Sequence, residues 1–193
     1  MLYLVRHAKA SVRPELPPAQ WHLSPEGRAD AEALAAEPRW AGLEMVYTSP
    51  EPKAAATAQR LAARHGLAIR FEPDLREVER DDWLDEGFDD ATRRYLAGEA
   101  IPSWEPREIA AARITTCIDG IAARHEGDVA VVSHGTALTL YVASFGDRDG
   151  VGGYELWSRL AMPDVALVDA AARQVVQRFG EQATTAKRGK ETS

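Results

Sequence analysis

The sequence predicts an α/β fold, a three-layer α/β/α sandwich around a mostly parallel central sheet. Short apolar runs typical of buried strands alternate with longer Ala- and Leu-rich segments typical of helices, and this alternation builds parallel sheets. Of the 193 residues, 45% are hydrophobic and 27% are charged, which supplies enough apolar surface for one compact core. We therefore expect a single domain over residues 1–180 and a disordered polar tail over 181–193.

Apolar patterning and turn residues predict the individual elements. Strands are expected at 1–5, 44–48, 67–71 and 129–132, then as a closing antiparallel pair at 154–160 and 165–169, with a further strand at 175–179. Helices are expected at 25–37, 52–65, 89–97, 108–125 and 136–145. Ser24 is the expected N-cap of the first helix, and Gly66 is the expected C-cap of the second.

Two segments lack a regular pattern. Residues 13–20 are rich in proline and are expected to form a surface loop over His7. Residues from about 72 to 105 form an acidic insertion with a short helix. Its aromatic residues are Trp83, Phe88, Tyr95 and Trp104. These side chains line a substrate wall or form a satellite core, and the sequence does not decide between the two.

Charge and cysteine content exclude several classes of protein. The net charge of −7 argues against a nucleic-acid-binding or anionic-membrane surface, because clustered Lys and Arg drive such binding. No run approaches the roughly 18 apolar residues of a membrane span, and the chain begins as a strand rather than a signal peptide. We therefore expect a cytoplasmic protein, whose oligomeric state the sequence leaves open. The single cysteine, Cys117, excludes an internal disulfide and is expected to pack within a helix.

Two histidines occupy equivalent places, each directly after an expected strand. His7 follows the first strand, and His134 follows the strand at 129–132. Ligands bind at the carboxyl ends of parallel strands, so we expect both imidazoles there. Arg6 precedes His7 and offers a planar set of donors suited to a phosphate or carboxylate, and Gly135 lets a bound group approach the backbone.

The motifs around these histidines occur in a specific order. They are Arg6-His7-Ala8, Leu23-Ser24-Pro25-Glu26-Gly27-Arg28-Ala29, Thr48-Ser49-Pro50 with Ala54 and Thr57-Ala58, Leu75-Arg76-Glu77, and Val132-Ser133-His134-Gly135. Together they cover residues 1–145 and resemble the histidine phosphatase superfamily, which has the phosphoglycerate mutase-like fold. The resemblance implies hydrolysis of a phosphomonoester, on a small molecule or a phosphoprotein, through a phosphohistidine intermediate and without a metal or cofactor.

The resemblance also implies a role for each site residue. His7 is the nucleophile, Glu77 protonates the leaving oxygen, and Arg6 and His134 hold the phosphoryl oxygens. Such a set suits phosphoryl transfer, which needs an in-line nucleophile and cationic donors for the charge on the equatorial oxygens. A phosphohistidine also replaces one difficult step by two easier ones.

Some residues depart from the family pattern or compete for a role. Lys53 stands in place of a second arginine and keeps its charge without the bidentate geometry. In the loop after His7, the usual Glu-Thr and asparagine are absent, and Arg13 is the candidate phosphate ligand of that stretch. Three further carboxylates compete with Glu77 as proton donor, namely Glu79, Asp81 and Asp82.

Other functions were weighed against this hydrolase. The main alternative is a phosphate-binding or regulatory module of the same fold with decayed turnover, motivated by Lys53 and the altered loop after His7. A mutase requires larger insertions, a metal hydrolase requires ligand spacing such as His-x-x-x-His, and a serine hydrolase requires a Gly-x-Ser-x-Gly elbow. His22 is expected at the surface or at the mouth of the pocket, and His65 and His125 at helix ends without a chemical role.

Overall fold

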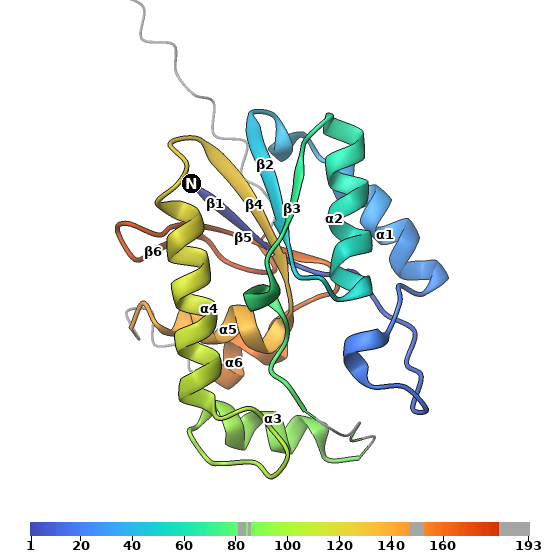
Figure 1. The fold of residues 1–193 in the computed structure, drawn as a ribbon, viewed down its shortest axis with the longest axis vertical. Helices are drawn as coiled ribbons and strands as arrows, with labels where there is room; N and C mark the ends of the chain where they lie inside the picture. The colour runs from blue at the N-terminus through green and yellow to red at the C-terminus, as the bar shows by residue number, and fades with distance from the viewer. Residues whose placement is uncertain (81–83, 85, 147–152, 182–193) are drawn as a thin grey trace, which may run out of the picture.

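The computed structural model describes residues 1–80, 84, 86–146 and 153–181. This part of the chain folds around a six-stranded sheet in the order β3-β2-β4-β1-β5-β6 (Figure 1). The strands are β1 (Leu2–Arg6), β2 (Leu43–Thr48), β3 (Ile69–Phe71), β4 (Asp128–Ser133), β5 (Asp164–Asp169) and β6 (Gln174–Gln177). β1 to β4 run parallel to one another, whereas β5 is antiparallel to β1 and β6 to β5. The predicted α/β fold with a mostly parallel sheet is confirmed.

Helices cover both faces of the sheet (Figure 1). α1 (Pro25–Ala35) and α2 (Pro52–His65) pack on one face, and α4 (Arg107–Ala122) and α5 (Gly135–Ala143) on the other. The remaining helices are α3 (Phe88–Leu96), α6 (Gly153–Arg159) and the 3-10 helices η1 (Pro18–Gln20), η2 (Pro38–Trp40) and η3 (Pro73–Leu75). Among the described residues, no helix has the length and apolarity needed to cross a membrane.

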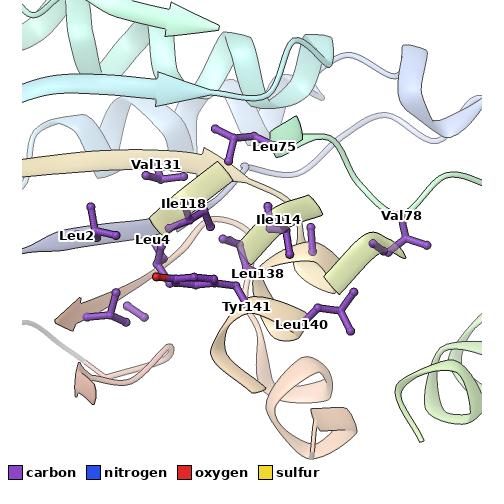
Figure 2. Packing of buried hydrophobic residues seen from close by; sticks show 14 of the residues in the cluster. Leu2, Leu4, Leu75, Val78, Ile114, Ile118, Val131, Leu138, Leu140 and Tyr141 are labelled. Atoms are coloured by element: carbon purple, nitrogen blue, oxygen red, sulfur yellow. The ribbon is translucent and has the colours of Figure 1, made fainter. Parts of the chain in front are cut away.

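Alternation along the central strands divides the core into two layers. Val131 of β4 belongs to the larger cluster, with Ile114 and Ile118 of α4 and Tyr141 of α5 (Figure 2). Its neighbour Val132 points to the opposite face and packs in the cluster formed with α1 and α2. Because β4 is buried on both faces, its sequence reads as a continuous apolar run.

The predicted helix caps are present. The Ser24 side chain accepts a hydrogen bond from the Gly27 N–H at 2.9 Å, with Pro25 at the first position of α1. Gly66 ends α2 in the left-handed conformation, with φ of 64°. Position 27 also requires glycine for a steric reason, because a Cβ there would lie 2.0 Å from the backbone oxygen of Lys9.

One predicted element is wrong. Residues 154–160 were expected to form a strand, but α6 occupies this segment and β5 pairs with β1 and β6 instead. Tyr154 and Trp157 stand three residues apart, so a helix brings them to one side, where their rings stack with centroids 5.9 Å apart. The closing antiparallel pair is formed by β5 and β6, and β6 overlaps the further strand expected at 175–179.

Candidate active site

His7 and His134 lie side by side at the carboxyl ends of adjacent parallel strands. The register of β1 and β4 pairs Arg6 with Ser133, so the next residue of each strand is a histidine. The two ring centroids are 5.1 Å apart, and the His7 N–H donates to Ser133 O at 3.0 Å. His7 is 7% exposed and His134 is fully buried. The placement predicted for both imidazoles is confirmed.

The tautomer of His7 follows from its hydrogen bond. His7 Nδ1 lies 2.7 Å from Ala8 O, and because a carbonyl only accepts, Nδ1 carries the proton and Nε2 keeps its lone pair. Thr57 Oγ1 accepts from the Ala8 N–H at 3.1 Å and fixes this stretch of backbone. Burial lowers the pKa of His7 well below its usual value, and the charges of Lys53 and Arg6 lower it further. His7 is therefore a neutral imidazole at neutral pH.

His134 lies behind His7 and contacts the residues that precede α2. Its Nε2 lies 2.9 Å from Ser49 Oγ and 3.4 Å from Glu51 Oε1, whereas its buried Nδ1 has no hydrogen-bond partner among the described residues. Burial, followed by the charges of Lys53 and Arg80, lowers the pKa of His134 well below its usual value.

Arg6 reaches from the end of β1 toward the start of α5. Its Nη1 donates to Leu160 O at 2.6 Å, while its buried Nε has no partner within the described part of the chain. The guanidinium packs against Gly135, where an added Cβ would lie 3.1 Å from Arg6 Nε. Burial lowers the pKa of Arg6, and the charge of Glu77 opposes this shift. The close packing explains the glycine that follows His134.

Lys53 forms an ion pair that the sequence analysis missed. Its ammonium contacts Glu51, and it also donates to Pro18 O of the proline-rich loop at 2.8 Å. Glu51 is 8% exposed and also accepts the Glu77 N–H through Oε1 at 2.8 Å. A carboxylate two residues before a lysine at a helix start is usually solvated, so the sequence carried no specific signal for this pair.

The Glu77 carboxylate caps the N-terminus of α5. Its Oε1 accepts from the N–H groups of Val78 and Ala137, both at 2.9 Å, and its Oε2 accepts from the Thr136 N–H at 3.1 Å. The positive end of a helix dipole favours a carboxylate at this place. In all, Oε1 accepts two N–H groups and Oε2 accepts one.

The segment that carries Glu77 is anchored from two sides. Arg113 of α4 donates through Nη1 to Asp74 O at 2.7 Å, and Ser133 Oγ donates to Leu75 O at 2.7 Å. Arg113 is itself held by a buried ion pair with Glu105 at 2.6 Å. The backbone position of Glu77 is thus fixed by α4 and by the end of β4.

A pocket of about 500 Å³ opens over these groups. The polar residues that line it include Arg6, His7, Glu51, Lys53, Glu77 and Arg80, and the apolar residues that line it include Val12, Trp21, Phe88, Trp157 and Met162. Pro18 and Ala19 of the proline-rich segment also line the pocket, as expected from its predicted place over His7, although Pro18–Gln20 forms the 3-10 helix η1 rather than an irregular loop. Both expectations for the insertion hold in part, since Phe88 lines the pocket while Tyr95 and Trp104 are buried in the larger core cluster. Trp83 lies outside the described residues.

Unpartnered nitrogen atoms gather at this pocket. Within the described part of the chain, six buried side-chain nitrogens have no hydrogen-bond partner. Three of them belong to Arg6 and Arg80, which line the pocket, and a fourth is Nδ1 of His134, which lies beside His7 but does not itself line the pocket. Buried donors without acceptors are costly and rare, so their grouping is typical of a site that receives an anion. Arg80, like Glu51, is a site residue that was not predicted from the sequence.

Residues 2–167 match the family model of the histidine phosphatase superfamily, branch 1. The chain belongs to this superfamily. An uncharacterized protein of Mycobacterium tuberculosis, Rv0525, is 32% identical, with 79% of this chain and 77% of that protein covered. The family resemblance inferred from the ordered motifs is thus confirmed.

Solved structures from bacteria and an amoeba have the same fold. Bacillus stearothermophilus YhfR superposes with a TM-score of 0.73 at 24% identity, covering 91% of this chain and 95% of that one. Phosphoserine phosphatase of Entamoeba histolytica, in complex with 3-phosphoglyceric acid, has a TM-score of 0.73 at 15% identity, covering 94% and 97%. Mycobacterial glucosyl-3-phosphoglycerate phosphatase Rv2419c, in complex with VO3, has a TM-score of 0.67 at 22% identity, covering 92% and 96%.

Two further residues of this histidine phosphatase superfamily member, Arg13 and Glu79, also have predicted roles. Arg13 is exposed, forms an ion pair with Glu15 and is not among the residues that line the pocket. The geometry therefore does not bring it to the site, and phosphate binding by Arg13 stays a prediction without support. Glu79 lines the pocket and forms an ion pair with Arg76 at 2.6 Å. Asp81 and Asp82 lie outside the described residues.

The other histidines and Cys117 lie away from the pocket. His22 is exposed and does not line it. His65 Nε2 contacts the last carbonyl of α1 at 2.8 Å, and His125 Nε2 contacts the Tyr47 hydroxyl at 2.7 Å. Cys117 packs half-buried against the larger core cluster, and burial raises its pKa to about 11. Among the described residues, no three His, Cys, Asp or Glu side chains form a group that could hold a metal ion.

Proposed function

We propose that this chain hydrolyses a phosphomonoester, on a small molecule or on a protein, through a phosphohistidine on His7. The observation that carries the proposal is the hydrogen bond between His7 Nδ1 and Ala8 O, because it selects the tautomer whose Nε2 attacks phosphorus. The phosphatases among the structural relatives support the same reaction class. Positive charge beside the nucleophile comes from Arg6 and Lys53, and we infer that turnover needs no metal.

The reaction takes two steps. His7 Nε2 forms a bond to phosphorus while the ester P–O bond breaks, and Glu77 gives its proton to the departing alkoxide. Water then attacks phosphorus, the P–N bond breaks, and orthophosphate leaves with His7 neutral again. Glu77, now a carboxylate, takes a proton from that water and is ready for the next turnover. Its Oε2, which accepts a single N–H, is the atom that carries this proton.

A labelled phosphoenzyme tests the proposal. Rapid acid-free quench of wild-type protein with ³²P-labelled phosphomonoester should give a base-stable, acid-labile label, and His7→Ala should give none. His22→Ala is the matched control, because His22 is an exposed histidine outside the pocket, and it should label like wild type. Label persisting in His7→Ala would rule out His7 as the nucleophile.

The same experiment separates the alternatives. A binding module with decayed turnover would bind orthophosphate but form no phosphoenzyme. A mutase would pass the label to an added alcohol acceptor, whereas a phosphatase releases it as orthophosphate. Turnover in the presence of a chelator tests the metal-independent mechanism, and full loss of activity there would contradict it. A cytoplasmic location remains a prediction that cell fractionation would test.

A further inference from the structure

Arg80 lies in the pocket on a segment that also carries Glu77. Its backbone forms a β-bridge with Trp104. Its guanidinium lies over the ring of Phe88, 4.6 Å from the centroid, and 5.7 Å from the centroid of Trp104. Arg80 lines the same pocket as His7. The two aromatic faces hold the guanidinium in a fixed plane through cation–π contacts.

Arg80 differs from the other cations of the pocket in that no described residue is found to accept a hydrogen bond from its two buried nitrogens. Lys53 is paired with Glu51, Arg76 donates to Glu79, and Arg6 donates to a backbone carbonyl. Arg80 Nε and Nη1 are buried without a hydrogen-bond partner in the described part of the chain. A guanidinium carries five donors and stays charged, so burying it with unmade hydrogen bonds is costly unless a ligand supplies the acceptors.

The charge of Arg80 lies close to the reacting groups. Burial lowers its pKa, while the carboxylates of Glu77 and Glu51 raise it. In turn, Arg80 lowers the pKa of His134 more than Arg6 does. Arg80 is thus near the same groups that surround the proposed phosphoryl site.

We propose that Arg80 binds the phosphoryl group of the substrate and supplies the planar guanidinium that Lys53 does not. The family pattern has an arginine at position 53, but Lys53 of this chain is held by Glu51 and by Pro18 O. A guanidinium matches phosphoryl oxygens with two parallel hydrogen bonds, whereas an ammonium acts as a point charge. Arg80 reaches the pocket from a different segment and restores the missing geometry. This inference rests on the proposed function.

Variants at Arg80 test the assignment with two substrates and one inhibitor. Arg80→Gln should lower kcat/KM by about 100-fold for p-nitrophenyl phosphate, and by the same factor for a phosphomonoester that also carries a carboxylate. The inhibition constant of orthophosphate should rise in parallel. Arg80→Lys keeps the positive charge without the two parallel donors of a guanidinium, and it should recover only part of the lost kcat/KM. Arg94→Gln is the matched control, because Arg94 is an exposed arginine of α3 paired with Glu99, and its kinetics should equal those of wild type.

Three outcomes would overturn the inference. A loss confined to the carboxylate-bearing substrate would mean that Arg80 binds a distal anion rather than the phosphoryl group. Unchanged kinetics in folded Arg80→Gln would mean that Arg80 serves only to pack on Phe88 and Trp104. If Arg80→Gln fails to fold, Arg80→Lys provides the test. An inhibition constant of orthophosphate equal to that of wild type in Arg80→Lys would contradict the need for a guanidinium. Failure of the proposed function itself is separate, because wild-type protein would then form no phosphoenzyme on His7.

Discussion

Glu51 and Lys53 form an ion pair at the start of α2, and both side chains are more than nine-tenths buried. The pair links three parts of the site. Lys53 also donates to Pro18 O of the proline-rich loop, and Glu51 also accepts the Glu77 N–H. The two residues therefore join α2, the loop beside His7 and the segment that carries the expected acid.

Removing one partner of this pair should destabilise the fold. Lys53→Met leaves the Glu51 carboxylate buried without its counter-ion, and breaking a buried pair in this way costs about 3 to 5 kcal/mol. The double variant Glu51→Gln/Lys53→Met buries no charge and should regain most of the loss. Urea unfolding at pH 7 measures both changes. Equal losses in the single and double variants would mean that the lysine stem, rather than its charge, stabilises the site.

Stability should fall as the pH drops below the ordinary histidine pKa. Burial lowers the pKa of His7 and His134 in the folded state, so below pH 6.5 the unfolded state binds more protons than the folded state. The contribution of these two histidines to the free energy of unfolding is present above pH 6.5, and it is lost as the pH falls toward their pKa values in the folded state. His7→Gln removes one of the two groups and should reduce the loss between pH 6.5 and 5.5 by about 1 kcal/mol.

Urea unfolding of wild type and His7→Gln at these two pH values measures the difference. The comparison reports the contribution of His7 together with its charge coupling to His134, whose ring centroid lies 5.1 Å away. The same pH dependence in both proteins would show that His7 is not held neutral by burial.

Two glycine substitutions should affect different properties, one the activity and the other the stability of the protein. Gly135→Ala places a Cβ 3.1 Å from Arg6 Nε and forces the guanidinium to shift, so kcat/KM should fall roughly 10-fold. Gly120→Ala, in the last turn of α4, meets only the end of Arg124 at 4.0 Å. It should leave activity unchanged and stabilise the protein by about 0.5 to 1 kcal/mol. Steady-state kinetics and thermal unfolding of both variants check this, and unchanged activity in Gly135→Ala would separate Arg6 from catalysis.

The positions of His7 and His134 could be predicted because they depend on local information. Each follows an apolar run, and parallel pairing of such runs brings their carboxyl ends to one edge of the sheet. Glu51 could not be assigned, because a carboxylate before a helix is usually a solvated residue, and its burial depends on Lys53. Arg80 could not be assigned either, because its place depends on the path of the insertion and on Phe88, which follows it by eight residues.

The error at 154–160 has a related physical origin. Over seven residues, apolar and polar positions fit a strand and a two-turn helix about equally well. The choice is made by the aromatic contacts, since Trp157 on α6 meets Phe88 on α3 with ring centroids 5.9 Å apart. Those contacts join segments almost seventy residues apart in sequence, and a local pattern does not contain them.

The role of Glu77 can be separated from that of a structural cap by changing the leaving group. An alkyl alkoxide needs a proton as the P–O bond breaks, whereas p-nitrophenolate departs without one. Glu77→Gln keeps the shape of the side chain and one oxygen that accepts from the Val78 and Ala137 N–H groups, but its NH2 group cannot accept from the Thr136 N–H. Phosphorylation of His7 by an alkyl phosphate should fall by about 10²- to 10⁴-fold in this variant, and the aryl ester should lose far less.

Single-turnover measurements are needed, because in the proposed mechanism Glu77 also activates water in the second step, and steady-state rates would combine the two effects. Glu51→Gln is an informative comparison. Both Glu51 oxygens are already engaged, one by Lys53 and the other by the Glu77 N–H, so this variant should not discriminate between the two esters. If Glu77→Gln slows both esters equally, its carboxylate serves only as the cap of α5. The same pair of esters, applied to Glu79→Gln and Asp81→Asn, would then identify the donor by the variant that loses the alkyl ester alone.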